Sequence, residues 1–469
     1  MRKVNVAILG AGTAGLTALG VVRKHTDDFV IVNDGPYGTT CARVGCMPSK
    51  ALIHIANDFH RRHTFDAIGI RGAGGLTMDV AAALAWVRDY RDARVAPNLK
   101  PTDRVGDRNL PGRASFVAPD ELLVTRPDGG EERVHADAVV VATGSTPIVP
   151  APWRAFGDRI LTSDTLFEQP DLPRRIAVVG LGAIGLELGQ ALARLGLEVT
   201  GFELRDSVAG LTDPELRAQA VERFASEFAV HLGHGVEIEP FGGDALHVVA
   251  GDAEATVDAA LVALGRAPNV TGLGLEQLGL PLNERGLPPF DPHTMQIGDL
   301  PIYIAGDVDA DRVVMHEASD EGFIAAWNAV HGPTRFQRRT PLSIAFTDPE
   351  IAMVGLPYAS LPEDALSASH DFTRQGRAIA MRSAHGKLKV YAEPGSGRLL
   401  GAEIVAPHGE HLAHLLALAI ERQLSVADIL TMPVYHPVLE EGLRSALRSL
   451  ARRAYGEAPL EFRPLDRAS

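Results

Sequence analysis

Two cysteines, Cys41 and Cys46, are the only ones in this chain of 469 residues, and both lie in the segment GTTCARVGCMPSK. A structural zinc site usually needs four ligands, and this pair supplies two with no second pair to complete the set. The sequence therefore predicts no metal site. Two readings of the pair remain: small unreactive core residues, or a redox couple that carries two electrons by thiol–disulfide exchange.

Composition narrows the class of protein. The content of 46% apolar and 22% charged residues is typical of a soluble globular protein with several domains. A net charge of −14 argues against nucleic-acid binding. No apolar run is long enough to span a membrane. Two cysteines are too few for a secreted disulfide scaffold, so we expect a reducing, cytoplasmic location.

A nucleotide-binding fingerprint opens the chain. In VNVAILGAGTAGLTAL an apolar strand is followed by Gly10, Gly12 and Gly15 in a G-x-G-x-x-G pattern and then by a helical segment. These glycines permit a tight turn and bring backbone N–H groups close to a pyrophosphate at the start of the helix. The next strand ends at Asn33-Asp34, where an acidic group is expected to hold a ribose.

A second fingerprint follows in RRIAVVGLGAIGLELGQALARLGLEVTGFE, at Gly180, Gly182 and Gly185. Its second strand ends at Glu203. A carboxylate at this position favours an unphosphorylated ribose and therefore NAD over NADP. Arg205, two residues later, favours NADP instead, because an arginine side chain can bind a 2′-phosphate.

Two further strands end in residues that suit a flavin site. ADAVVVATGSTPIVP is a predicted strand ending in Thr143-Gly144-Ser145, and LPIYIAGDVDADRVVMHEASDEG is one ending in Gly306-Asp307. Asp307 is a candidate for binding ribitol hydroxyls, although an ordinary turn residue would fit the same pattern.

Together these motifs resemble those of the pyridine nucleotide-disulfide oxidoreductases, most closely the dihydrolipoamide dehydrogenases. The likeness covers nearly the whole chain and includes, in family order, the two fingerprints, the cysteine box with MPSK, ATGSTP, ALGRAPN, IYIAGDV, MHEASDEG, AFTDPEIAMVG and YHPVLEEGL. It implies an α/β fold with two Rossmann-like domains, for FAD and NAD, and a C-terminal α+β dimerisation domain. The implied boundaries are 1–148 for the first part of the FAD domain, 149–270 for the NAD domain, 271–340 for the central part that completes the FAD domain, and 341–469 for the interface domain of a homodimer.

The resemblance also assigns roles to the reactive residues. It makes Cys41 and Cys46 a redox disulfide in which a substrate thiolate attacks Cys41 and Cys46 faces the flavin. A helix beginning at CMPSKAL would lower the pKa of the Cys46 thiol. Lys50 and Glu187 match the charged pair beside the flavin. His436 and Glu441, five residues apart, match the base and its carboxylate partner.

The expected cofactors are FAD and NAD. The resemblance places their contacts at Gly10, Gly12, Gly15, Asn33, Asp34, Thr40, Lys50, Ala114, Thr143, Gly144, Ser145, Gly180, Gly182, Ala183, Ile184, Gly185, Glu203, Gly265, Arg266, Asp307 and Met315.

Four residues depart from the family pattern: Asn33 stands where glutamate is usual, Thr39 where glycine is, Tyr435 where a small or apolar residue is, and Val438 where threonine is.

The predicted activity is NAD-dependent oxidation of a protein-bound dihydrolipoyl group, with the lipoyl carrier as a separate chain or a small dithiol as substrate. A related NAD(P)H-dependent disulfide or quinone reductase is the alternative. A flavin- or NAD-binding scaffold without activity is a third hypothesis, which the retained cysteines and His436 oppose.

Overall fold

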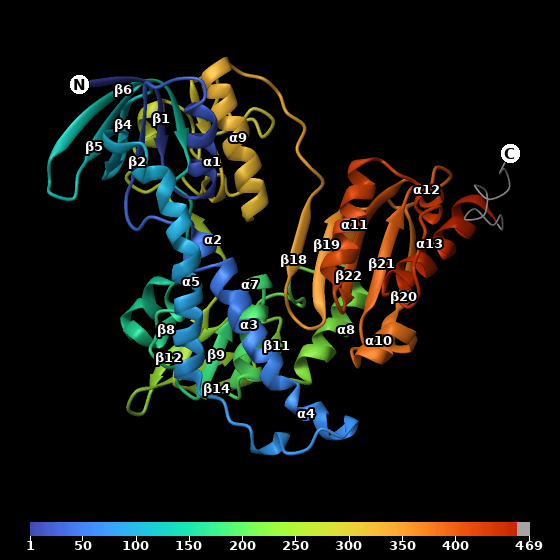
Figure 1. The fold of residues 1–469 in the computed structure, drawn as a ribbon. Coiled ribbons are helices and arrows are strands. Elements are labelled where there is room, and N and C mark those ends of the chain that lie inside the picture. The colour runs from blue at the N-terminus through green and yellow to red at the C-terminus, as the bar shows by residue number, and fades with distance from the viewer. Residues whose placement is uncertain (457–469) are drawn as a thin grey trace.

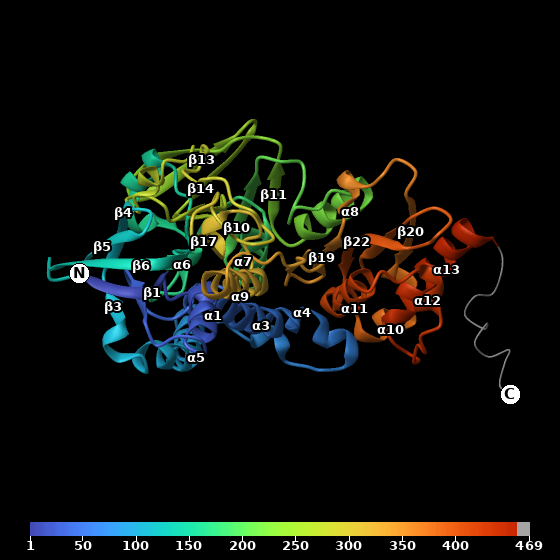
Figure 2. The same ribbon diagram turned by 90° about the horizontal axis from the view of Figure 1, so that it is seen from above.

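The computed structural model describes residues 1–456 as three units, with the strand β1 and the helix α13 at opposite sides of the molecule (Figures 1 and 2). The first unit holds a seven-stranded sheet in the order β3-β2-β1-β6-β5-β4, with β17 paired to β6. Its strands are β1 (Arg2–Leu9), β2 (Phe29–Asn33), β3 (Asn109–Pro111), β4 (Arg113–Ala118), β5 (Glu121–Thr125), β6 (Glu131–Val141) and β17 (Ile302–Ile304).

The central pairs of this sheet are parallel, and β4, β5 and β6 form an antiparallel edge. Apolar runs such as VAIL in β1 and AVVV in β6 are buried on both faces of the sheet, as parallel strands between covering layers require. Helices α1 (Thr13–Val22) and α9 (Met315–His331) pack against each other on one face.

The second unit repeats this plan. Its five-stranded parallel sheet has the order β11-β10-β9-β15-β8 and is joined by a small antiparallel sheet, β12-β13-β14. The strands are β8 (Ile160–Leu161), β9 (Arg175–Val179), β10 (Glu198–Glu203), β11 (Ala229–Leu232), β12 (Glu237–Phe241), β13 (Ala245–Ala250), β14 (Ala253–Val257) and β15 (Ala259–Val262). The helices are α6 (Ser163–Leu166), α7 (Ala183–Arg194) and α8 (Pro214–Ala225).

Helices and a strand pair connect these two units. Helix α3 (Cys46–His60) packs on α5 (Val80–Asp103) and on α7, so it lies between the two sheets (Figure 1). The short helices α2 (Thr40–Arg43) and α4 (Arg62–Phe65) flank α3. Strands β7 (Ser145–Pro147) and β16 (Arg266–Pro268) pair close to two of the predicted domain boundaries, which themselves stay predictions.

The third unit is an antiparallel sheet in the order β18-β19-β22-β21-β20, covered by helices. Its strands are β18 (Leu342–Ala345), β19 (Glu350–Gly355), β20 (Leu366–Asp371), β21 (Lys387–Ala392) and β22 (Leu399–Ala406), and its helices are α10 (Gly376–Met381), α11 (Gly409–Glu421), α12 (Val426–Leu430) and α13 (Glu440–Tyr455). The polar linker at 332–341 precedes it without helix or strand.

The predicted fold class is confirmed: two Rossmann-like units and a C-terminal α+β unit. One helix start differs from the sequence pattern. Proline is favoured at the first helical position, so Pro437 would suit a helix start, but α13 begins at Glu440, with Leu439 before it. Within residues 1–456, each helix is too short or too polar to serve as a membrane span.

Candidate active site

The two cysteines lie on consecutive helices at the junction of the first two units. Cys41 belongs to α2, whose start is capped by the side chain of Thr39, which accepts a hydrogen bond from Ala42 N at 3.2 Å. Cys46 is the first residue of α3, as the sequence predicts. Thr39, a departure from the family pattern, therefore serves as a helix cap beside the reactive pair.

Both cysteines are partly buried, and both are free thiols in this structure. Hydrogen bonding between the two thiols is the largest influence on each: it raises the pKa of Cys41 well above its usual range and lowers the pKa of Cys46 to about 7. The ammonium of Lys50 lowers the pKa of Cys46 further, against the effect of burial. Cys46 is therefore the thiol that ionises first.

Lys50 and Glu187 form an ion pair across the two units, with 2.8 Å between Nζ and Oε2. Glu187 is buried, with 5% of its surface exposed, although an isolated helix carboxylate would be expected at the surface. Its other oxygen accepts a hydrogen bond from Phe346 N at 2.8 Å, and the ring of Phe346 lies 4.6 Å from Lys50 Nζ. The buried carboxylate is thus paired and hydrogen-bonded, as burial of a charge requires.

A polar row along α7 fixes the segment that carries Phe346. Gln190 Nε2 donates to Asp348 O and Gln190 Oε1 accepts from Asp348 N, both at 2.8 Å. Arg194, which is 3% exposed, donates to Asp348, Glu227 and Asn57. These contacts join all three units. Sequence patterns did not reveal them because the partners are far apart in the chain.

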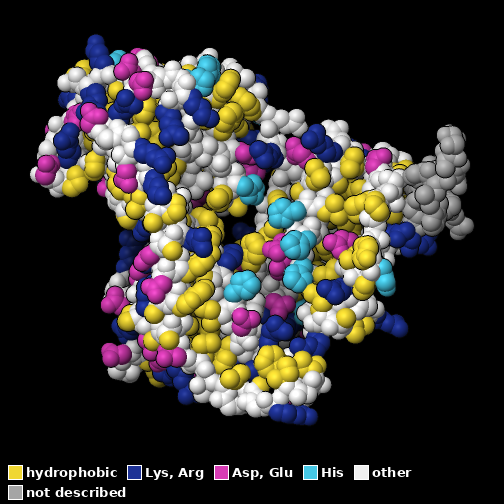
Figure 3. Space-filling view, viewed as in Figure 1, with side chains coloured by type: hydrophobic (Ala, Val, Ile, Leu, Met, Phe, Trp, Pro, Cys, Tyr) yellow, Lys and Arg dark blue, Asp and Glu magenta, His cyan; other side chains and the backbone are white. Residues whose placement is uncertain are grey.

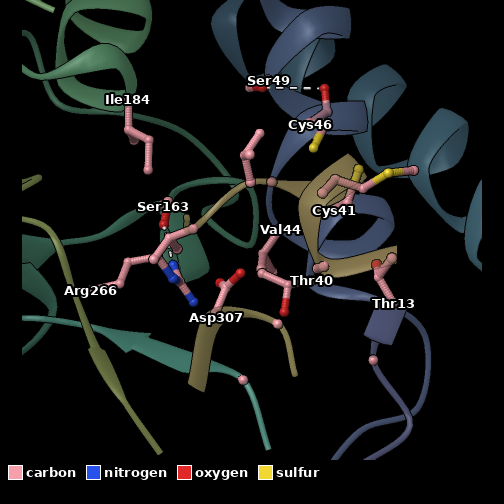
Figure 4. Close-up of a pocket in the computed structure, with 18 of the residues that line it drawn as sticks. Thr13, Thr40, Cys41, Val44, Cys46, Ser49, Ser163, Ile184, Arg266 and Asp307 are labelled. Carbon is pink, nitrogen blue, oxygen red and sulfur yellow. Dashed lines mark hydrogen bonds between the residues drawn. The ribbon is translucent and has the colours of Figure 1, made fainter. Parts of the chain in front are cut away.

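A cavity of about 1170 Å³, including its open mouth, lies between the cysteine pair and the ends of the parallel strands (Figure 4). The predicted site residues that line it are Gly12, Thr40, Cys41, Cys46, Lys50, Gly144, Ala183, Ile184, Glu187, Arg266, Asp307 and Met315. Cys41 and Cys46 direct their sulfur atoms toward each other at one side of this space (Figure 4).

The first glycine loop fits a pyrophosphate. A Cβ at Gly15 would lie 1.9 Å from Gly10 O, so only glycine permits this close packing of helix on loop. A Cβ at Gly12 would meet no atom within 4 Å, and Gly12 faces the cavity at the start of α1. The free N–H groups of that helix start can therefore reach an anionic group in the cavity.

The ribose positions of the two units have the same local geometry and different chemistry. Asn33 Oδ1 accepts from Ala11 N at 3.0 Å, and Asn33 Nδ2 donates to Gly35 O. Glu203 Oε2 accepts from Leu181 N at 2.7 Å, and Oε1 accepts from Arg205 N at 3.0 Å. Asp34, suggested as a substitute for the missing glutamate, is exposed, and Asn33 is the residue that faces the glycine loop.

A chain of polar side chains crosses the cavity wall. Ser145 Oγ donates to Asp307 Oδ2 at 2.7 Å and accepts from Arg266 Nε at 2.8 Å. Arg266 also pairs with Asp164 of the second unit at 3.0 Å. Asp307, which follows Gly306 at the end of β17, is held toward the cavity with Arg266 beside it (Figure 4). A ribitol hydroxyl is the kind of group this carboxylate can accept from.

The other predicted cofactor residues lie outside this cavity: Gly10, Gly15, Asn33, Asp34, Ala114, Thr143, Ser145, Gly180, Gly182, Gly185, Glu203 and Gly265. Most belong to the glycine loops, strand ends or cavity wall just described. Ala114 is buried in the core of the first unit, in β4. Several cavity residues were not predicted, among them Ser49, Phe167, Val313, Val314 and Ile344. Phe167 and Ile344 come from segments without a cofactor motif, whereas the other three lie within quoted motif segments but were not singled out.

His436 and Glu441 are close together but do not line the cavity. His436 Nδ1 lies 2.9 Å from Glu441 Oε1, and Glu441 Oε2 accepts from Val438 N at 3.2 Å. The histidine lowers the pKa of the Glu441 carboxyl. The side chain of His436 is 80% exposed on the third unit. The Glu441 carboxylate therefore contacts one ring nitrogen of His436, and the imidazole lies on the outside of the chain.

Comparison with known proteins agrees with this geometry. The family described as pyridine nucleotide-disulphide oxidoreductase matches residues 4–322, and its dimerisation domain matches residues 342–447. A dihydrolipoyl dehydrogenase of Haloferax volcanii is 31% identical, covering 96% of each chain. A mercuric reductase of Acidithiobacillus ferrooxidans is 30% identical, covering 96% of this chain and 83% of its own. The crystal structure of LpdA from Mycobacterium tuberculosis has a TM-score of 0.83 at 25% identity, over 96% of this chain and 100% of that one.

The chain belongs to the pyridine nucleotide-disulphide oxidoreductases. It is an oxidoreductase with FAD and NAD as cofactors, and it carries the dimerisation domain of that family. The two glycine loops, the cavity and Asp307 fit FAD in the first unit and NAD in the second.

Proposed function

We propose that this protein is an NAD-dependent dihydrolipoyl dehydrogenase that oxidises a lipoyl group on a separate carrier protein. The main support is the cysteine pair at the cavity, in which the hydrogen bond with Cys41 and the charge of Lys50 lower the pKa of the Cys46 thiol to about 7. The relatives named dihydrolipoyl dehydrogenase, which match over the full length, support the same substrate class. The low cysteine content supports a reducing, cytoplasmic location.

In this proposal one thiolate of the substrate attacks Cys41 of the disulfide, and Cys46 leaves as a thiolate. The second substrate thiol then displaces Cys41. The substrate dithiol becomes a disulfide and the cysteine pair becomes a dithiol, so two electrons pass to the enzyme. A leaving thiolate of low pKa speeds the first exchange. The hydrogen bond with Cys41, the ammonium of Lys50 and a backbone hydrogen bond each lower the pKa of the Cys46 thiol.

FAD, when bound, would supply the redox chemistry that links the cysteine pair to NAD. Lys50 and Glu187 orient the region between the cysteines and the second unit, and Ser145 and Arg266 hold Asp307 toward the cavity. Glu203 at the end of β10 is placed to accept hydrogen bonds from the ribose of NAD.

The substrate must lose protons, and His436 is the proposed base. Glu441 holds its Nδ1 side, which leaves Nε2 free to take a proton from a substrate thiol. Because His436 lies on the outside of its own chain and away from its own cavity, we propose that it serves the cysteine pair of a second copy in a homodimer. The dimerisation domain at 342–447 supports this arrangement.

A related disulfide or quinone reductase is the second candidate. It is favoured by the departures around the reactive groups, above all Tyr435, which is 84% exposed next to His436. Mercuric reduction is less favoured because, with two cysteines in all, this chain has no additional cysteine pair.

Steady-state kinetics of the purified holoenzyme test the proposal. Dihydrolipoamide with NAD is compared with NADPH plus oxidised glutathione and with NADH plus a quinone. Dihydrolipoamide with NAD should give the highest kcat/KM. A higher value for the quinone or for glutathione rejects the assigned substrate.

A further inference from the structure

A second group of metal-ligating side chains lies outside the cavity, in the segment PHGEHLAH at the start of α11. His408, Glu410 and His411 each offer a ligand atom, and these atoms all lie within 4.8 Å of one another. The two imidazole rings are nearly parallel, with 6.0 Å between their centroids and 10° between their planes. Figure 3 shows histidine side chains gathered in this region, beside the hollow between the units.

We propose that His408, Glu410 and His411 bind a divalent transition-metal ion, of which Zn²⁺ and Cu²⁺ are the best matched. Two imidazoles and one carboxylate form a donor set that suits these ions and not the all-oxygen sites of Mg²⁺ or Ca²⁺. Three protein ligands leave at least one coordination position open to water or another ligand.

The distances suit a metal after small side-chain movements. Bonds of about 2.0–2.1 Å to a tetrahedral ion place two ligand atoms roughly 3.4 Å apart. Glu410 Oε1 and His411 Nε2 are already 3.6 Å apart. Both histidines are exposed, and His411 retains 68% of its side-chain surface, so their rotation meets little obstruction.

The backbone beneath these ligands is fixed. Gly409 is buried, and a Cβ there would lie 3.2 Å from Ile404 Cγ2, so the segment packs closely on β22. Glu410 N donates to Glu350 Oε2 at 2.8 Å, and His408 has a φ of +50°, which is uncommon for a residue other than glycine. The ligands are therefore carried on a well-defined turn, which reduces the entropy lost on binding.

Charge also favours a cation here. The positive end of α11 opposes a cation, but Glu410 supplies a negative ligand within the group. The sequence from 399 to 421 contains no lysine or arginine. This run of ligands was not singled out from the sequence because H-x-E-H lacks the spacing of a familiar zinc motif.

The test is titration of the untagged holoenzyme with ZnCl₂ by calorimetry, with the cysteine pair oxidised so that the thiols cannot bind the ion. We expect one equivalent to bind per chain. His411→Ala and His408→Asn should each weaken metal binding at least tenfold. Loss of a residue that only supports a ligand lowers metal affinity about 10- to 100-fold, and loss of the ligand itself should lower it at least as much. Asparagine is chosen at 408 because it tolerates the left-handed conformation.

His414→Ala is the matched control. His414 is exposed on the same helix, and its Nδ1 lies 2.7 Å from Glu410 O, so its loss should leave the affinity unchanged. Cu²⁺ electron paramagnetic resonance should show two nitrogen ligands in the wild type and one in His411→Ala. No stoichiometric binding, or equal affinity in the wild type, His408→Asn and His411→Ala, overturns the proposal.

Discussion

Lys50 Nζ lies 2.8 Å from Oε2 of Glu187, and this contact joins α3 of the first unit to α7 of the second, one turn from Cys46. The same ammonium lowers the pKa of the Cys46 thiol, and the Glu187 carboxylate raises it. The ion pair therefore has two effects, since it joins the two units and its two charges shift the pKa of the reactive thiol in opposite directions.

The first prediction follows from these opposite effects. Lys50→Met should raise the pKa of Cys46 above about 7, and Glu187→Gln should lower it. The measurement is the pH dependence of iodoacetamide alkylation of Cys46 in the reduced enzyme, because the thiolate is the reacting form. The half-point should move to higher pH in Lys50→Met. Lys24→Met, at an exposed lysine after α1, is the control. An unchanged half-point in Lys50→Met contradicts the electrostatic role.

The second prediction concerns Asn33, which occupies the position that Glu203 has in the second unit. Asn33→Glu replaces a neutral acceptor by a charged one. The difference is about 1 kcal/mol per hydrogen bond, so FAD should bind roughly fivefold more tightly. Titration of the apoenzyme with FAD measures the dissociation constant, and Asp34→Asn should leave it unchanged. Weaker binding by Asn33→Glu would show that the ribose is held elsewhere.

The third prediction concerns the choice between NADH and NADPH. Each charge-assisted bond that Glu203 makes to the ribose is worth about 1.5–3 kcal/mol, so Glu203→Ala should raise the apparent KM for NADH roughly ten- to a hundredfold and narrow the gap to NADPH. Glu203→Gln keeps an oxygen that accepts the hydrogen bond from Leu181 N but removes the negative charge. It therefore distinguishes the effect of the charge on the ribose from the support of the glycine loop. If the wild type already prefers NADPH, Arg205 determines the choice and the assignment to Glu203 is wrong.

The fourth prediction tests the shared site. A mixed dimer of a Cys41→Ser chain and a His436→Gln chain contains one site with both cysteines and an intact base if the base comes from the partner. About half of wild-type activity per heterodimer should then return, although each homodimer is nearly inactive. Recovery should be absent if both groups of a site come from one chain. Subunit exchange is verified separately by native mass spectrometry.

Local patterns predicted the two glycine loops and the start of α3 at Cys46, because glycine spacing and apolar periodicity act over a few residues. They did not predict the row formed by Gln190 and Arg194 with the segment around Asp348, since partners more than a hundred residues apart leave no local pattern. Pro437 does not identify the start of α13 at Glu440, because proline suits a helix start and also suits the turn before one. The domain boundaries and the roles of the site residues stay predictions.

The most direct test of the account is transfer of electrons from the substrate to the cysteine pair. Oxidised holoenzyme is mixed with dihydrolipoamide without oxygen or NAD, quenched, alkylated and analysed by mass spectrometry. Cys41 and Cys46 should resist alkylation before mixing, and both should be alkylated afterwards. In a separate assay, Cys46→Ser should show no turnover of dihydrolipoamide with NAD. Cysteines that stay unchanged after mixing, or turnover that survives in Cys46→Ser, would contradict the central claim.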